Sequence, residues 1–234
     1  MSKIKKIYNI LLKNYGSQKW WPVTEENSVV PKYSGGPKNE KQQLEVIFGA
    51  ILTQNTSWKN VEKAIINLNK NNLIDIKKII EIENKKLAQI IKSSGYHNQK
   101  AERLKIFSDF LLKNYNGYLK KLFEKNIDEL RKELLEIKGI GPETADSIIL
   151  YSSQNPIFVV DAYTKRIFSR IGFKEKTYDE FQNVFHKNLE KNIKVFNEYH
   201  ALIVEHGKNI CKKKALCSEC VISELCESKN NFIS

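Results

Sequence analysis

Four cysteines lie close together near the C-terminus of this 234-residue chain, and their sulfurs are potential metal ligands. Five, two and five residues separate them: Cys211, Cys217, Cys220 and Cys226. Zinc sites usually join two short knuckles across a longer insertion, whereas this spacing gives one compact loop. Four thiolates from one short loop are typical of a 4Fe–4S cluster, which we therefore favour over zinc.

A second candidate site is the segment EIKGIGPETADSI, residues 136–148, where a Gly-x-Gly interrupts two helical patterns. A tight turn between two helices would explain it, because Gly139 and Gly141 tolerate positive φ. The alternative is functional: the amides of Ile140, Gly141 and Glu143, at the start of a helix, would bind a phosphate. The motif alone leaves both interpretations open.

The charge of the chain is strongly basic, with 39 Lys and Arg against 27 Asp and Glu and a net charge of +12. Such a surface suits a polyanionic partner. No apolar run approaches the ~18 residues of a membrane-spanning helix, and the N-terminus is typical of an amphipathic helix instead of a signal peptide. We expect a soluble cytoplasmic protein, in which reducing conditions disfavour disulfides between the cysteines.

Helical periodicity dominates the chain. A polar segment, residues 24–42, is expected to be a loop or linker, and after it apolar residues recur three and four positions apart. Only NPIFVVDAY, residues 155–163, looks strand-like, and it is too short to build a sheet. The expected fold class is therefore all-α, with a helix-hairpin-helix around the Gly-x-Gly.

The hairpin, an aspartate twenty residues after its second glycine (Asp161) and the cysteine loop occur in an order that resembles the helix-hairpin-helix superfamily of DNA glycosylases, specifically its endonuclease III branch. Five segments carry the resemblance: LTQNTSWKNVEKA (52–64), SGYHNQKAERL (94–104), KGIGPETAD (138–146), VVDAYTKRI (159–167) and HGKNICKKKALCSECVISELC (206–226). The loop is one residue shorter between its first two cysteines than the commoner family spacing.

The resemblance implies two helical domains with double-stranded DNA and a flipped damaged base between them. One domain, 39–155, would be a helical barrel that contains the hairpin. The other would be discontinuous, 1–38 plus 156–234, and would carry the 4Fe–4S loop at about 207–228. We expect a monomer.

The resemblance also assigns contacts with DNA. Phosphates would be bound by the hairpin turn and by basic residues of the cysteine loop: Lys138, Gly139, Ile140 and Gly141, with Lys212, Lys213 and Lys214. Gln54 or Asn55 would fill the gap left by the flipped base, which offsets part of the cost of extrusion. For Asn55 a helix C-cap is the alternative, and for the three lysines a solvated surface.

For catalysis, Asp161 would stabilise positive charge on the sugar and help to position or deprotonate water. It could equally be a helix N-cap, and both roles can hold together. Bifunctional family members carry a lysine at position 143, whose amine forms a Schiff base. Glu143 cannot do so, which predicts a monofunctional enzyme unless Lys138 or Lys165 substitutes.

The damaged base is the least determined part of the prediction. Trp20, Trp21 and Trp58 resemble the base pocket of the 3-methyladenine glycosylases of the endonuclease III type, and an indole face attracts a cationic alkylated purine. Tryptophans are also common core residues. That subgroup's best-known pattern lacks the cysteine loop, so the chain combines features of two branches.

The favoured function is therefore a monofunctional base-excision-repair DNA glycosylase for alkylated purines such as 3-methyladenine. The alternatives are a T/G or U/G mismatch glycosylase, a bifunctional glycosylase/lyase, and a non-catalytic DNA-binding protein, against which Asp161 argues. The four histidines, His97, His186, His200 and His206, show no ligand spacing on a common helix face, and we expect them to be structural.

Overall fold

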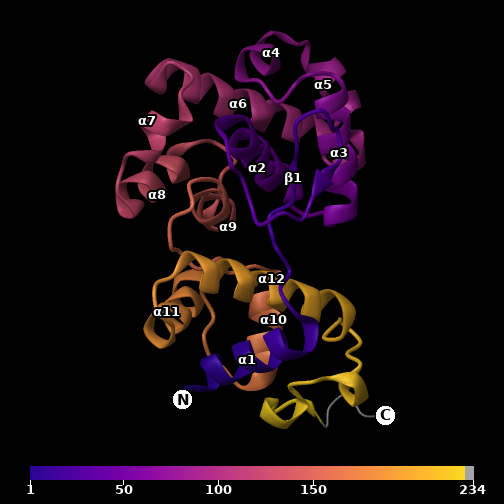
Figure 1. The fold of residues 1–234 in the computed structure, drawn as a ribbon, viewed down its shortest axis with the longest axis vertical. Helices are drawn as coiled ribbons and strands as arrows, with labels where there is room; N and C mark the ends of the chain where they lie inside the picture. Colours follow the sequence, from indigo (N-terminus) through magenta and orange to yellow (C-terminus); the bar gives the residue numbers. More distant parts are fainter. Residues whose placement is uncertain (230–234) are drawn as a thin grey trace. The chain divides into compact units, whose positions relative to one another are not determined.

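The computed structural model describes residues 1–229, which fold into helices apart from two very short strands (Figure 1). The chain forms two compact units, one built from Met1–Trp20 and the chain from Pro156 onward, the other from Trp21–Asn155. The first expected boundary, after residue 38, therefore differs from the structure, which places it after Trp20. The second boundary between the units of the structure falls between residues 155 and 156.

Residues 21–38 belong to the second unit because they are anchored in its interior. Val23 is fully buried, and the backbone N–H of Thr24 donates to Glu45 Oε1 at 2.7 Å. Two-residue strands β1 (Val23–Thr24) and β2 (Pro31–Lys32) pair antiparallel within this otherwise irregular segment. The polar, glycine-containing sequence of this segment predicts a loop. It does not predict that the buried carboxylate of Glu45 holds the loop in place.

The second unit is organised around α2 (Glu40–Thr53), which runs through the middle of this unit in Figure 1. Val46, Ile47, Phe48 and Ile51 are fully inaccessible, as expected of a helix that is covered on nearly every side. The other elements surround it: α3 (Trp58–Lys70), α4 (Ile76–Glu81), α5 (Asn84–Ile90), η1 (Lys92–Ser94), α6 (His97–Tyr115), α7 (Leu119–Phe123), α8 (Ile127–Glu136), α9 (Pro142–Ser147) and a π-helical turn η2 (Ile148–Ser152).

The expected helix-hairpin-helix is formed by α8, a short turn and α9. Gly139 adopts φ +92°, and a Cβ at this position would lie 2.8 Å from the side chain of Arg103, so glycine is required there. Gly141 has φ −98°, and a Cβ on this residue would meet no atom within 4 Å. Of the two glycines that tolerate positive φ, only Gly139 adopts it, whereas Gly141 serves as the N-cap of α9.

The first unit contains α1 (Lys3–Tyr15), α10 (Ala162–Ile171), α11 (Tyr178–Asn188), α12 (Ile193–Asn209) and two 3-10 turns, η3 (Cys217–Glu219) and η4 (Ser223–Leu225). The strand-like segment before α10 enters the core as extended chain without pairing. Phe158 stacks on Phe185 with ring centroids 3.7 Å apart, and Val159 is fully buried. The Tyr199 hydroxyl of α12 donates to the Ile4 carbonyl of α1 at 2.9 Å.

In the part of the chain that the structure describes, no helix is both long enough and apolar enough to cross a membrane.

Candidate active site and cysteine loop

Asp161 is the N-cap of α10. Its backbone is extended, and Oδ1 accepts hydrogen bonds from the Thr164 backbone N–H at 2.7 Å and from the Thr164 hydroxyl at 2.8 Å. The residue is 7% exposed. The helix start thus fixes the direction of this carboxylate through one of its two oxygens, as the N-cap interpretation predicts.

The second oxygen of Asp161 faces a histidine of α12. His200 Nε2 lies 3.7 Å from Asp161 Oδ2, and both side chains are about nine-tenths buried. Burial raises the pKa of Asp161, but His200 and the two Thr164 hydrogen bonds outweigh burial and lower the pKa below its usual value. The carboxylate is therefore ionised at neutral pH although it is buried.

His200 was expected to be merely structural, and sequence reasoning missed its position. Asp161 and His200 lie far apart in the chain, and only the packing of α12 against α10 brings them together. The sequence signal for His200 was a histidine at an apolar position of a helix. Helical periodicity predicts that such a residue is buried, but it does not show that Asp161 lies beside it.

In the hairpin turn, three amides are predicted to bind phosphate, and the structure corrects one of them. The Ile140 N–H donates to the Ile137 carbonyl at 3.0 Å, and the Ile140 side chain is buried. The N-terminus of α9 has no side-chain cap, and Gly141 and Glu143 are exposed at its first turn. Amides of a first turn lack intrahelical partners, so a ligand at this turn would meet Gly141 and Glu143 but not Ile140.

Gln54 and Asn55 follow α2 directly and have different environments. Gln54 Nε2 donates to the Gly139 carbonyl and to Thr144 Oγ1, both at 2.9 Å, and Gln54 Oε1 accepts from Arg103. Asn55 is exposed and left-handed, with φ +54°. The structure therefore uses Gln54 to hold the hairpin turn, whereas the Asn55 side chain lies at the surface.

Two of the three candidate pocket tryptophans contact each other. The Trp21 and Trp58 rings are nearly perpendicular with centroids 5.3 Å apart, and Trp21 also packs against Tyr151 at 5.1 Å. Trp21 is 4% exposed and lies against Gly49, where a Cβ would approach its indole to 3.1 Å. Trp21 is thus a core residue, and an edge-to-face pair leaves no slot for a base between these two rings. Trp20 is half-buried and belongs to the other unit.

Neither lysine proposed as a substitute for Glu143 is buried among apolar groups, and each is engaged elsewhere. Lys138 pairs with Glu102 at 3.0 Å on the surface, and Lys165 lies over the Tyr178 ring at 5.9 Å. Burial lowers the pKa of Lys100 to about 8, but its Nζ is buried and donates to the Leu52 and Ser94 carbonyls. Lys100 therefore joins α2 to α6 and is not positioned as a nucleophile.

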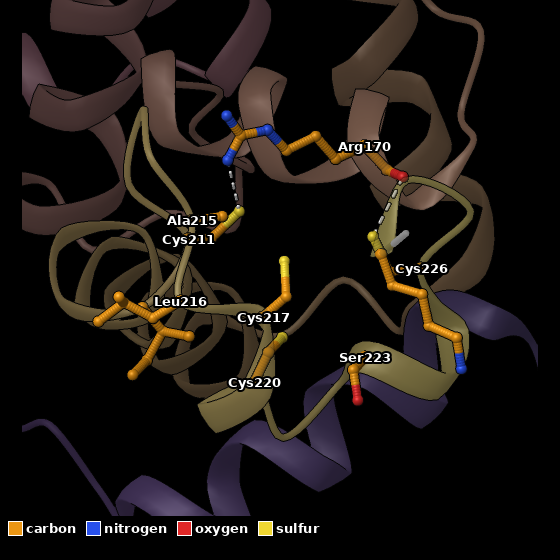
Figure 2. Close-up of a pocket in the computed structure, with 10 residues that line it drawn as sticks. Arg170, Cys211, Ala215, Leu216, Cys217, Cys220, Ser223 and Cys226 are labelled. Atoms are coloured by element: carbon orange, nitrogen blue, oxygen red, sulfur yellow. Dashed lines mark hydrogen bonds between the residues drawn. The ribbon is translucent and has the colours of Figure 1, made fainter. Parts of the chain in front are cut away.

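The four cysteines line one space of about 320 Å³, partly open to solvent, and none forms a disulfide (Figure 2). Arg170 of α10 borders this space and donates to Cys211 Sγ at 3.2 Å. Its guanidinium also donates to the Lys212 and Lys213 carbonyls, at 2.6 and 2.9 Å, which leaves the side chains of Lys212, Lys213 and Lys214 exposed.

Four cysteine side chains are a donor set that suits either zinc or a 4Fe–4S cluster. Within residues 1–229, however, no group of three or more His, Cys, Asp or Glu side chains is arranged to hold a metal ion. Burial raises the pKa of Cys220 to about 11, so a bound metal cation, zinc or iron, would favour its thiolate form. The preference for a 4Fe–4S cluster over zinc therefore rests on the spacing of the four cysteines in one short loop.

Comparison with known proteins identifies the class. Residues 48–191 match the model of the HhH-GPD superfamily base excision DNA repair proteins. The chain belongs to this family of DNA glycosylases, enzymes that act on DNA, as the helix-hairpin-helix and the order of motifs predicted.

Relatives cover nearly the whole chain. The putative DNA repair glycosylase MJ1434 of Methanocaldococcus jannaschii is 49% identical over 97% of this chain and 96% of its own length. Endonuclease III of Thermotoga maritima is 29% identical over 82% of this chain and 86% of its own length. These relatives confirm the endonuclease III branch.

Solved structures agree in fold. Helicobacter pylori 3-methyladenine DNA glycosylase (MagIII), bound to 1,N6-ethenoadenine, superposes with a TM-score of 0.68, 28% identity and coverage of 89% of this chain and 98% of that one. An endonuclease III–DNA covalent intermediate superposes with a TM-score of 0.78 over both whole chains at 19% identity. The all-α glycosylase fold is thereby confirmed, and binding to DNA follows from membership of the family.

Proposed function

We propose that this protein is a monofunctional DNA glycosylase of base excision repair that hydrolyses the N-glycosidic bond of alkylated purines, such as 3-methyladenine, in double-stranded DNA. The observation that carries the proposal is the Asp161 carboxylate, which is buried, ionised and held by Thr164 at the start of α10. A carboxylate with those properties is what an N-glycosidase needs beside the anomeric carbon.

In the proposed reaction, Asp161 stabilises the positive charge that develops on the sugar as the base departs. The interaction is strong because the carboxylate is already desolvated and oriented before the substrate binds. The same group helps to orient or deprotonate the water that attacks the sugar. Alkylated purines are good leaving groups, so this modest catalytic apparatus suffices.

Hydrolysis without strand cleavage is supported by the groups around α9. Glu143 occupies the position where bifunctional relatives carry the Schiff-base lysine, and a carboxylate forms no imine. Lys138 and Lys165 are engaged by Glu102 and Tyr178. The product is therefore an intact strand with an abasic site.

For the substrate, the MagIII comparison and the tryptophans support an alkylated purine. We assign base stacking to Trp58, whose edge-to-face contact with Trp21 fixes its ring, and leave Trp21 and Tyr151 as its support. For Trp20, contact with the base stays a prediction from its WWP motif. A cationic purine gains on the order of 1 kcal/mol from an indole face.

DNA binding is assigned to the hairpin turn and to exposed basic groups. Asn55, exposed at the end of α2, is the better wedge, because both polar atoms of the Gln54 side chain are engaged, by Gly139, Thr144 and Arg103. Phosphates would meet Lys138, Gly139 and Gly141, and the exposed side chains of Lys212, Lys213 and Lys214 would add further contacts. Each phosphate contact adds about 0.9 to the salt dependence of binding.

Cys211, Cys217, Cys220 and Cys226 are proposed to hold a 4Fe–4S cluster. When bound, the cluster supplies the covalent links that keep this loop folded, because the loop has little apolar core of its own. Arg170 of α10 contacts two of the four sulfurs at 3.2 Å each: its guanidinium donates to Cys211 Sγ, and its carbonyl accepts from the free Cys226 thiol.

The test uses purified protein and duplexes that each contain one lesion, followed by alkali. Cleavage of the 3-methyladenine strand only after alkali is the expected result, and Asp161→Asn protein is the control for a contaminating glycosylase. Cleavage before alkali would indicate a lyase, and release of thymine or uracil opposite guanine would indicate the mismatch alternative. No release from any lesion, with DNA binding retained, would indicate a non-catalytic binding protein.

A further inference from the structure

A chain of polar contacts runs from the N-terminal helix to the cysteine loop. Tyr15, the last residue of α1, has its hydroxyl 2.7 Å from His206 Nδ1. The other ring nitrogen, His206 Nε2, lies 3.6 Å from Cys220 Sγ. His206 is 1% exposed, so water does not compete for either nitrogen.

The chemistry of the sulfur determines which atoms donate. A thiolate bound to iron has no proton and can only accept a hydrogen bond. A neutral imidazole has one N–H and one acceptor nitrogen. If Nε2 carries the proton and donates to Cys220 Sγ, then Nδ1 must accept from the Tyr15 hydroxyl. The reverse tautomer would place a nitrogen lone pair against a negatively charged sulfur.

We propose that Tyr15 and His206 form a hydrogen-bond relay that ends on the Cys220 sulfur and raises the reduction potential of the 4Fe–4S cluster. The inference rests on the proposed cluster, and it assigns α1 a role in setting the electronic properties of the C-terminal loop. Hydrogen bonds to cluster sulfurs stabilise the more negative, reduced state and are a principal means of tuning the potential.

The surroundings hold the relay in one geometry. Gly207 follows His206, and a Cβ there would lie 2.5 Å from the Tyr163 ring, so this part of α12 is pressed against α10. Arg166 donates to the Gly207 carbonyl at 2.8 Å and to the Cys211 carbonyl at 2.9 Å. Burial raises the pKa of Tyr15 to about 12, which keeps its hydroxyl protonated as a donor. In such a dry, fixed site a hydrogen bond has more electrostatic effect than at the surface.

The relay is tested with Tyr15→Phe, which removes one hydroxyl and keeps the ring that packs 5.9 Å from the imidazole. The matched control is Tyr8→Phe on the same helix, whose ring packs on Tyr199 at 5.1 Å. His206→Gln is a second variant at the middle of the relay. Iron content and visible absorption of each holoprotein are measured first, followed by the reduction potential by voltammetry and the Fe–S stretching bands by resonance Raman in H2O and D2O.

We expect Tyr15→Phe and His206→Gln to shift the potential to more negative values and to alter the deuterium sensitivity of one Fe–S band, with Tyr8→Phe unchanged. An iron-loaded Tyr15→Phe protein with the potential and the deuterium shift of the wild type would overturn the relay but not the cluster. Absence of iron from the wild type would overturn both. A relay confirmed in a protein that releases no base would contradict the glycosylase proposal alone.

Discussion

Arg131 Nε lies 2.7 Å from Asp146 Oδ1, and Arg131 Nη2 lies 3.3 Å from Asp146 Oδ2. This paired contact joins α8 to α9, the two helices of the hairpin, next to the turn that includes Gly139. The Asp146 side chain is fully buried, whereas the Arg131 side chain is 23% exposed. The hairpin is therefore held by a buried charge pair in addition to its apolar contacts.

Replacing Arg131 by methionine should destabilise the protein strongly, because a buried carboxylate loses the cation that neutralises it. We expect the free energy of unfolding in urea to fall by about 3 kcal/mol, within the range known for breaking a buried pair. Lys113→Met, which removes the exposed pair with Asp109, should cost less than about 1 kcal/mol. Equal losses in the two variants would contradict the importance of the hairpin pair.

Asp161→Asn should separate catalysis from folding. Asparagine is about as good an N-cap as aspartate, so α10 should keep its start and the stability should change little. The single-turnover rate of base release should fall about 10²–10⁴-fold, because the charge opposite the developing sugar cation is lost. Asp75→Asn, at the N-cap of α4, is the matched control and should leave the rate unchanged. Binding to a duplex with an abasic analogue should persist in both variants.

The pH dependence of the single-turnover rate of base release should depend on the contact between His200 and Asp161, because this contact lowers the pKa of Asp161. The pKa of Asp161 is lower in the folded protein than in the unfolded chain, where it is about 3.9. The ionised carboxylate therefore adds to the free energy of unfolding above about pH 3.9, and this contribution is lost as the pH falls through the lower pKa of the folded state. Wild-type single-turnover rates should therefore lose no activity through this carboxyl above about pH 4. Besides Thr164, His200 is the group that faces this carboxylate and lowers its pKa.

In His200→Gln, the pKa of Asp161 should rise because burial is no longer offset by the imidazole. The acid limb of the pH–rate profile should then move to higher pH, whereas a purely structural defect would lower the rate equally at every pH. His97→Gln, at the start of α6 in the other unit, is the control and should keep the wild-type profile. If the acid limb of the His200→Gln profile lies at the wild-type pH, His200 does not set the pKa of Asp161.

The sequence predicted the features that depend on local pattern. Apolar residues at helical spacing identified the helices, and the Gly-x-Gly with a following proline identified the hairpin. Asp161 was recognised both as a candidate catalytic residue and as an N-cap, and the structure shows the cap directly. Of the two glycines named for their tolerance of positive φ, Gly139 adopts it, a conformation that other residues rarely take, with the Arg103 side chain close by.

Features that depend on tertiary packing were not predictable in the same way. The first unit boundary was misplaced because a polar loop, residues 21–38, is fixed by buried Glu45, whose role has no sequence signature. His200 and His206 lie six residues apart on α12 and so point roughly 120° apart around the helix. One can therefore face Asp161 and the other the cysteine loop, although neither shows ligand spacing along the sequence.

Glu143→Lys tests whether position 143 separates hydrolysis from strand cleavage. The residue is exposed in the first turn of α9, so the change should leave the fold intact, with only a small loss of the favourable interaction between an acid and the helix N-terminus. If position 143 meets the sugar, the new amine should form a Schiff base. Borohydride should then trap a protein–DNA adduct, and strands should break before alkali.

Glu143→Gln is the matched variant, since it removes the same charge without supplying an amine, and it should release the base and leave the strand intact. Trapping by the wild type or by Glu143→Gln would show that Lys138, Lys165 or another amine acts instead. An active Glu143→Lys protein that gives no adduct would place position 143 away from the sugar, because an amine beside the anomeric carbon of an abasic site reacts with it.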